Sequence, residues 1–269
     1  MGTIGFIGSG NMAEALIKGI IAAKMYASKN VFISDIRAER LAFLAGKYGV
    51  AACKTNSEAA AKVDILVLSI KPQNMTEALE SIKDSIGRKI LVISIAAGIR
   101  VAKIAAALGE VAVVRVMPNT PALIGEGASA LFANERAKPL LEKALSIFSA
   151  VGKAVVVDDE DLIDAVTAVS GSGPAYYFLL MEEMIKAGVK LGLPETVAKD
   201  LVLQTAKGAG LLAVEADKNG ESPAQLRQKV TSPGGTTAAA LKVFADGNLS
   251  ELISTAIARA RDRGRELSK

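Results

Sequence analysis

The chain has 269 residues, 51% of them hydrophobic and 22% charged, so it can bury a large core and is expected to form two domains. It contains no histidine, which excludes Ser-His and Cys-His nucleophile pairs, histidine-ligated zinc and the His-Asp dyad of many hydroxy-acid dehydrogenases. Cys53 is the single cysteine, which excludes an internal disulfide and a thiolate cluster, and we expect no metal site.

The net charge of +4 is unevenly distributed. Residues 1–150 carry 18 basic and 12 acidic residues, whereas residues 151–269 carry 14 and 16. The positive excess lies in the first half of the chain, as suits a polyphosphate ligand. The arginine cluster from Arg259 to Arg265 is interrupted by an acidic residue and lacks aromatic residues. We therefore predict a solvated terminal helix there and no nucleic-acid surface.

The longest apolar runs, such as residues 65–70 and 90–97, are much shorter than the roughly 20 residues of a membrane helix. The N-terminus enters a predicted strand at once, without a basic lead and an apolar signal core. We therefore expect a cytoplasmic protein that has no membrane partner.

The first predicted elements form a dinucleotide-binding motif. An apolar strand over residues 3–7 leads into Gly8-Ser9-Gly10-Asn11-Met12-Ala13 and a helix over 13–23. Gly8 would make the tight turn, and Gly10 would leave room for a pyrophosphate. A second strand over 30–34 ends at Asp35, 22 residues after Ala13, where a ribose hydroxyl would be met. The alternative is a glycine turn that only packs a helix on a strand.

Strand-like and helix-like segments alternate through the first half of the chain. Continuous apolar runs predict strands over residues 65–70, 90–95 and 111–117, with further strands over 128–132 and 154–157 and a helix over 139–150. This pattern is typical of a doubly wound parallel sheet, which we assign to a dinucleotide-binding domain over residues 1–158.

In such a sheet, ligands bind at the carboxyl ends of the strands. Small or rigid residues follow three of the predicted strands, and they would let the backbone approach a flat nicotinamide. They are Ser69, Lys71 and Pro72, then Ala96, Ala97 and Gly98, and finally Asn119, which lies between Pro118 and Pro121. A solvated lysine at a strand end remains an alternative for Lys71.

From residue 159 onward the sequence shows no strand signal. The acidic stretch 158–161 marks the change, and helices are predicted over residues 162–169, 175–191, 195–217, 223–230, 237–244 and from 249 onward, with a break at 170–174. We assign residues 159–269 to a second, all-helical domain.

Residues 230–237, with the sequence Val-Thr-Ser-Pro-Gly-Gly-Thr-Thr, form a turn that leads into an apolar helix. The two glycines let several N–H groups point one way, and the helix N-terminus adds partial positive charge, so a small carboxylate could bind there. A plain turn with a helix N-cap is the alternative.

These motifs, together with 94–98, 117–121 and 170–176, resemble pyrroline-5-carboxylate reductase over nearly the whole chain. The resemblance implies a Rossmann domain followed by an all-helical dimerisation domain of the 6-phosphogluconate-dehydrogenase type. It also implies reduction of 1-pyrroline-5-carboxylate to L-proline, the last step of proline biosynthesis, with NADPH or NADH as cofactor. A homodimer, or a ring of dimers, would follow. The predicted cofactor residues are Gly8, Ser9, Gly10, Asn11, Met12, Asp35, Arg37, Ser69, Lys71, Pro72, Ala96, Ala97, Gly98 and Asn119.

The resemblance makes Thr237 the catalytic group that bonds the ring nitrogen, with Ser232, Gly235 and Thr236 holding the substrate carboxylate. Cyclic imines are partly protonated near neutral pH, so a site without histidine is sufficient. Ser222 departs from the family pattern, because members usually carry histidine there. Asp35 would suit an unphosphorylated ribose and Arg37 a 2′-phosphate, which leaves the choice of cofactor open.

Two other functions remain open at this point. A hydroxy-acid dehydrogenase of the 6-phosphogluconate type would carry a lysine and an asparagine where this chain has Tyr177 and Leu180, which argues against alcohol oxidation. A nucleotide-sensing scaffold would bind the cofactor without turning over an imine. The continuous apolar run 176–181 predicts that a second subunit covers this helix.

Overall fold

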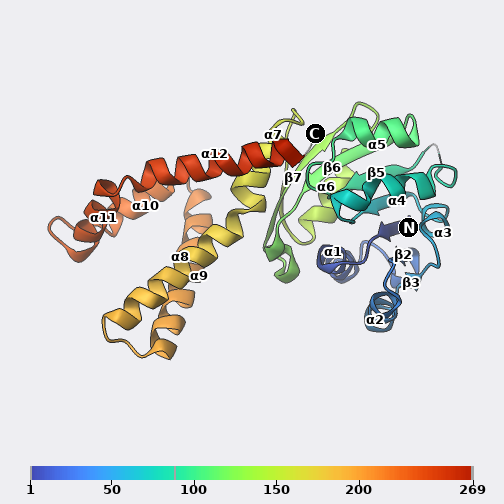
Figure 1. Cartoon of the computed structure of the whole chain (residues 1–269). Coiled ribbons are helices and arrows are strands. Elements are labelled where there is room, and N and C mark those ends of the chain that lie inside the picture. Colours follow the sequence, from blue (N-terminus) through green and yellow to red (C-terminus); the bar gives the residue numbers. More distant parts are fainter. Residues whose placement is uncertain (1, 88, 268–269) are drawn as a thin grey trace. The chain divides into compact units, whose positions relative to one another are not determined.

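Eight strands in the first part of the chain form one sheet, shown in the computed structural model of Figure 1. The structure describes residues 2–87 and 89–267. The strands are β1 (Ile4–Ile7), β2 (Val31–Ser34), β3 (Ala51–Ala52), β4 (Ile65–Leu68), β5 (Leu91–Ser94), β6 (Ala112–Met117), β7 (Gly127–Ala133) and β8 (Gly152–Val156).

The sheet has the order β3-β2-β1-β4-β5-β6-β7-β8, so the chain winds outward on both sides of β1. Strands β1 to β6 pair in parallel, which confirms the predicted doubly wound sheet. The last part of the sheet differs from a purely parallel one, because β7 is antiparallel to β6. Only a short segment with one 3₁₀ turn (Thr120–Ile124) joins β6 to β7, and a parallel pair would need a longer crossover.

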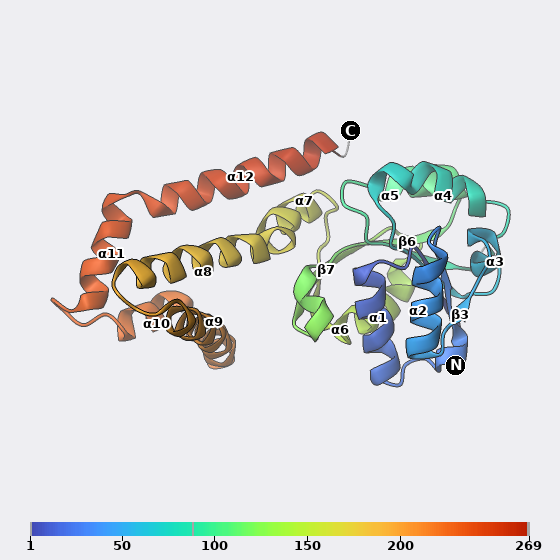
Figure 2. The same cartoon turned by 60° about the horizontal axis from the view of Figure 1, so that its bottom comes forward.

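Helices cover both faces of the sheet (Figure 2). Helices α1 (Asn11–Ala22), α2 (Ala38–Tyr48) and α6 (Leu141–Ser149) pack on one face, and α3 (Asn56–Ala60), α4 (Met75–Ile82) and α5 (Val101–Leu108) pack on the other. Alternate residues of β4 enter the two cores: Ile65 and Val67 join one, Leu66 and Leu68 the other. Burial on both sides explains why these strands read as unbroken apolar runs.

The described chain beyond β8 contains only helices, as predicted. The predicted break at 170–174 is too long, because α7 (Leu162–Val166) continues through a π-helical turn (Thr167–Gly171), and only the bend at Ser172 separates that turn from α8 (Gly173–Lys190). Pro174 is tolerated because it lies in the first turn of α8, where its missing N–H costs little. A Cβ atom at Gly171 would lie 2.6 Å from Met117 Cε, so a larger residue there would displace the end of this flexible side chain.

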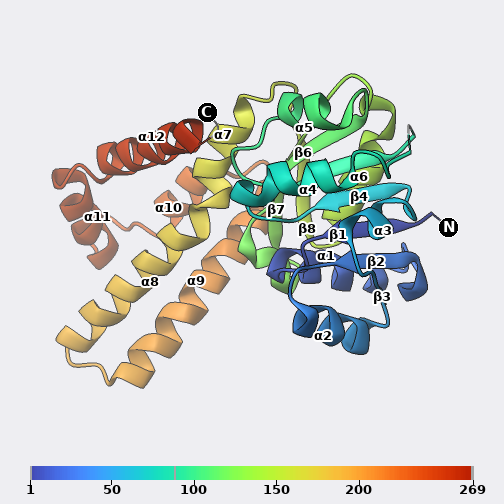
Figure 3. The same ribbon diagram turned by 45° about the vertical axis from the view of Figure 1, so that its right-hand side comes forward.

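The remaining helices are α9 (Glu195–Asp217), α10 (Pro223–Lys229), α11 (Thr236–Asp246) and α12 (Leu249–Leu267). A short turn over 191–194 joins α8 to α9 (Figure 3). None of the described helices is long and apolar enough to cross a membrane.

Internal packing divides the chain into two compact units. Unit 1 contains Met1–Pro174 and Arg259–Lys269, and unit 2 contains Ala175–Ala258. Within the described part of unit 2, only Ala198 and Ala216 are buried, whereas large apolar side chains such as Tyr177 (67%) and Phe178 (61%) are exposed. The functional boundary between residues 158 and 159 stays a prediction.

Candidate active site

Two glycines of the turn between β1 and α1 serve different purposes. Gly8 has φ +86°, and a Cβ atom there would lie 2.6 Å from the Ser69 carbonyl oxygen, so only glycine fits. Gly10 has φ −70° and ψ −173°, and a Cβ atom there would meet nothing within 4 Å. Contacts within the described chain therefore do not explain glycine at position 10. The open space fits a ligand that closely approaches the backbone.

The same turn presents unpaired N–H groups. The N–H groups of Gly8 and Ser9 donate to the Ser34 carbonyl (2.9 Å) and the Asp35 carboxylate (2.7 Å). In the part of the chain that the structure describes, the N–H groups of Gly10 and Asn11 have no acceptor. They lie at the positive end of α1, which is an arrangement that binds phosphate groups. The turn thus fits the pyrophosphate of a dinucleotide.

Asp35 follows β2, and its carboxylate is almost fully buried. Its oxygens accept hydrogen bonds from Ser9 N–H at 2.7 Å and from the Arg37 guanidinium at 3.0 and 3.1 Å. Burial alone would raise the pKa of Asp35, but these hydrogen bonds and one from the Arg37 N–H outweigh it and lower the pKa. Asp35 is therefore ionised at neutral pH, and the half-exposed Arg37 side chain balances its charge.

Parallel pairing brings the carboxyl ends of the central strands to one edge of the sheet. Ile7 pairs with Ser34 and Leu68, and Leu68 pairs with Ser94. The residues that follow these strands therefore lie along the edge that carries the glycine turn. They include Ser69, Lys71, Pro72, Ala96, Ala97 and Gly98. The structure brings these predicted cofactor residues together with Gly8 to Met12 and Asp35.

Asn119 has a structural use that the sequence analysis missed. Its Oδ1 accepts from the Ala128 N–H at 2.8 Å, and its Nδ2 donates to the Ser170 carbonyl at 3.0 Å. The buried amide therefore ties the end of β6 to β7 and to the π-helical turn. Its role toward the cofactor stays a prediction.

The predicted substrate residues lie in unit 2, around the start of α11. Gly234 has φ +70°, and the Gly235 N–H donates to the Ser232 carbonyl at 3.0 Å, which closes a turn. Gly235 caps α11 without a side-chain hydrogen bond, and in the described chain the N–H groups of Thr236 and Thr237 have no acceptor. This helix N-terminus can therefore bind a carboxylate.

Ser222, the departure from the family pattern, has a local role at the start of α10. Its hydroxyl accepts from the Gln225 N–H at 3.3 Å, and the Gln225 side chain accepts from the Ser222 N–H at 2.7 Å. These reciprocal bonds form a capping box that pairs N–H groups at the helix start. Ser222 thus stabilises the start of α10, although its hydroxyl cannot act as an acid or base near neutral pH as a histidine side chain could.

Sequence reasoning also missed Arg40 and Glu14. Arg40 donates from Nε to the Ser9 carbonyl at 2.6 Å and pairs with Glu14 on α1. The local pattern holds no signal for these contacts, because Ser9 and Arg40 are 31 positions apart. Only the folded arrangement of α1 and α2 reveals them.

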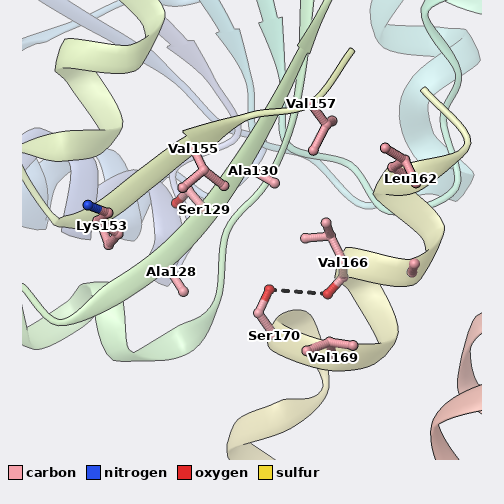
Figure 4. A pocket seen from close by; sticks show the side chains of 11 residues that line it. Ala128, Ser129, Ala130, Lys153, Val155, Val157, Leu162, Val166, Val169 and Ser170 are labelled. Carbon is pink, nitrogen blue, oxygen red and sulfur yellow. Dashed lines mark hydrogen bonds between the residues drawn. The ribbon is translucent and has the colours of Figure 1, made fainter. Parts of the chain in front are cut away.

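Unit 1 also contains an apolar pocket of about 420 Å³ beside β7, β8 and α7 (Figure 4). Its walls include Val155, Val157 and Leu162, and the nearby Ser170 hydroxyl donates back to the Val166 carbonyl. Among the described residues that line it, Lys153 alone is charged. None of the predicted cofactor or substrate residues is among the described residues that line this pocket, so it is a poor candidate for the active site.

Comparisons with known proteins identify the family of the chain. Residues 160–267 match a family model described as pyrroline-5-carboxylate reductase dimerisation. Residues 3–98 match one described as NADP oxidoreductase, coenzyme F420-dependent. A pyrroline-5-carboxylate reductase of Pseudomonas aeruginosa is 46% identical over 268 residues, which cover 99% of this chain and 97% of the relative. One from Arabidopsis thaliana is 35% identical and covers 99% and 95%.

Solved structures of the same family are similar to this chain over its full length. A pyrroline-5-carboxylate reductase from Coxiella burnetii has 42% identity and a TM-score of 0.93, covering 100% of this chain and 99% of that one. A Plasmodium falciparum pyrroline carboxylate reductase with NADP bound has 31% identity and a TM-score of 0.87, covering 100% and 98%. A prephenate dehydrogenase from A. aeolicus, at 14% identity and a TM-score of 0.55, shares the fold alone. Full-length similarity at this level shows that the chain belongs to the pyrroline-5-carboxylate reductase family.

Proposed function

We propose that the residues described above carry out the family's reaction in this chain. The enzyme is an oxidoreductase that reduces 1-pyrroline-5-carboxylate to L-proline with NAD(P)H, the last step of proline biosynthesis. The structural observation that carries the proposal is the open space at Gly10, next to two N–H groups that have no acceptor among the described residues.

The cofactor would bind along the carboxyl edge of the sheet, in a domain formed by residues 1–158. NAD(P)H, when bound, supplies the hydride. Gly8 gives the turn its shape, and the Gly10 and Asn11 N–H groups would hold the pyrophosphate. Asp35 and Arg37 would meet the adenosine ribose, with Arg37 able to hold a 2′-phosphate. The residues proposed to line the rest of the site are Ser9, Met12, Ser69, Lys71, Pro72, Ala96, Ala97, Gly98 and Asn119.

The substrate would bind at the start of α11, in a helical domain formed by residues 159–269. Ser232, Gly235 and Thr236 would hold the carboxylate, which the unpaired N–H groups and the positive helix end support. The hydroxyl of Thr237, a half-buried residue, would then bond the ring nitrogen as it gains amine character. The protonated imine needs no separate acid, so this chain needs only to bind and orient the ring.

Unit 2 needs a further surface to cover its apolar side chains. Only two of its described residues are buried, and its helices expose Tyr177, Phe178 and Leu180. The match of residues 160–267 to a dimerisation model supports a homodimer through this domain, and we further propose a ring of dimers. We also propose that the enzyme acts in the cytoplasm.

The test is the loss of nicotinamide absorbance with pyrroline-5-carboxylate, run in parallel with NADPH and NADH. We expect turnover, and we expect Thr237→Ala to lower kcat about tenfold or more, because one hydrogen bond to the reacting nitrogen is lost. Thr237→Ser keeps the hydroxyl and serves as the matched control. Equal kinetics for Thr237→Ala and the parent would reject the role of Thr237.

The same assay separates the other functions. Binding of NADPH without turnover of the imine would favour a nucleotide-sensing scaffold. Oxidation of a hydroxy acid in place of imine reduction would favour a dehydrogenase of the 6-phosphogluconate type. Light scattering at the assay concentration would show a dimer, a larger ring or, against the proposal, only monomer.

A further inference from the structure

Arg40 lies at the start of α2 and contacts the glycine turn that precedes α1. Its Nε donates to the Ser9 carbonyl at 2.6 Å, and its Nη2 contacts the Gly10 carbonyl at 3.4 Å. Only 17% of the Arg40 side chain is exposed. A short hydrogen bond from a charged donor is among the stronger contacts a backbone carbonyl can make. Arg40 therefore contacts the carbonyl groups of the turn whose N–H groups form the proposed pyrophosphate site.

This contact bears on the direction of the neighbouring N–H groups, together with the hydrogen bond that the Gly10 carbonyl accepts from the Glu14 N–H at 3.0 Å. A peptide unit is planar and trans, so its C=O and N–H groups point in opposite directions. The Ser9 carbonyl shares a plane with the Gly10 N–H, and the Gly10 carbonyl shares one with the Asn11 N–H. These are the two N–H groups without an acceptor in the described chain. Gly10 has no side chain of its own to restrain this backbone.

Glu14 on α1 holds Arg40 in place. Its carboxylate accepts from Arg40 Nη2, from Lys47 Nζ at 3.0 Å and from the Tyr48 hydroxyl at 2.9 Å. Burial alone would raise the pKa of Glu14, but these three donors outweigh it and lower the pKa to about 2. The Arg40 guanidinium also lies over the Phe43 ring, 5.3 Å from its centre. The guanidinium is thus fixed by an ionised partner and by an aromatic ring.

We infer that Arg40 is a positioning residue for the cofactor, which orients the Gly10 and Asn11 N–H groups before the dinucleotide binds. The inference rests on the proposed function. Donors that are already oriented bind a phosphate more tightly, because less conformational entropy is lost on binding. NADH and NADPH share the pyrophosphate, so Arg40 should matter equally for both.

The experiment measures the dissociation constants of NADPH and NADH by nicotinamide fluorescence for the full-length protein and its variants. We expect Arg40→Gln to raise both constants by about tenfold, as suits the loss of a charge-assisted hydrogen bond. The KM for pyrroline-5-carboxylate at saturating cofactor should not change. Lys47→Gln is the matched control, because it removes another cation from Glu14 without touching the turn, and it should bind both nucleotides like the parent.

Arg40→Lys covers the case in which Arg40→Gln does not fold. Lysine keeps the charge but lacks the planar fork, so it cannot hold Glu14 and both carbonyls at once, and both constants should rise by a smaller factor. A loss confined to NADPH would mean that Arg40 contacts the 2′-phosphate directly, and it would overturn the inference. Unchanged binding of both nucleotides by either Arg40 variant would do the same. Turnover by the parent protein tests the proposed function separately.

Discussion

Replacing Gly10 by alanine should separate cofactor binding from folding. The backbone angles at Gly10 suit any residue, and beyond its two chain neighbours the new methyl group would meet no atom of the described residues within 4 Å. Alanine is a poorer N-cap than glycine, but it also reduces the entropy of the unfolded chain. These two effects oppose each other, so the free energy of unfolding should change by less than about 1 kcal/mol.

Cofactor binding by this variant should fall sharply. The methyl group would occupy the space left for the pyrophosphate, so we expect the dissociation constants of NADPH and NADH to rise at least about tenfold, or about 1.4 kcal/mol. Nicotinamide fluorescence measures the binding, and urea unfolding followed by circular dichroism measures the stability. A variant with parental stability and parental cofactor affinity would refute the argument that a ligand fills this space.

Gly8→Ala is the matched comparison within the same turn. Its backbone angle of +86° costs alanine about 1–2 kcal/mol. The contact of 2.6 Å with the Ser69 carbonyl oxygen forces the backbone to shift, which adds about 1–3 kcal/mol. Gly8→Ala should therefore lose about 2–5 kcal/mol of stability. If Gly10→Ala proves as unstable as Gly8→Ala, the distinction between the two glycines is wrong.

Three further changes test other parts of the structure. Glu14→Gln should destabilise the protein at neutral pH, because the folded parent protein lowers the pKa of the Glu14 carboxyl from 4.5 to about 2 and is stabilised by its ionised form. This contribution to the free energy of unfolding is complete above pH 4.5 and is lost as the pH falls through 2. The free energies of unfolding of the two proteins, measured in urea, should therefore converge in acid. Ser222→Ala removes the capping box of α10 and should cost about 1 kcal/mol in the same unfolding assay, whereas Ser222→Asp should retain most of the stability. Arg37→Gln leaves the negative charge of the Asp35 carboxylate without its cationic partner, so this charge should repel a 2′-phosphate. The ratio of kcat/KM for NADPH to kcat/KM for NADH should therefore fall about tenfold or more. An unchanged ratio would show that Arg37 does not contact the 2′-phosphate.

Much of the fold could be predicted from local patterns. The helix over 195–217 has the predicted bounds, since its end precedes a polar loop and its start follows Pro194. The strand runs 65–70 and 90–95 were also predicted, because burial on both faces leaves an unbroken apolar sequence. The β7 direction and the π-helical turn over 167–171 were not predictable in this way, because each depends on which distant element the segment packs against.

The sequence by itself determined the family, the alternation of strands and helices, and the two glycine-rich turns, because these depend on residue type and short-range spacing. Only the tertiary structure showed that Asp35 is paired with Arg37, that Arg40 reaches the Ser9 carbonyl, and that Asn119 bridges two elements. It also showed that Arg115, within an apolar strand, is buried beside Glu160 (3.1 Å) and Asp164 (3.3 Å) from the acidic stretch and α7. Most of these partners lie tens of residues apart. Strand register and helix packing decide whether they meet, and short-range sequence patterns do not encode that geometry.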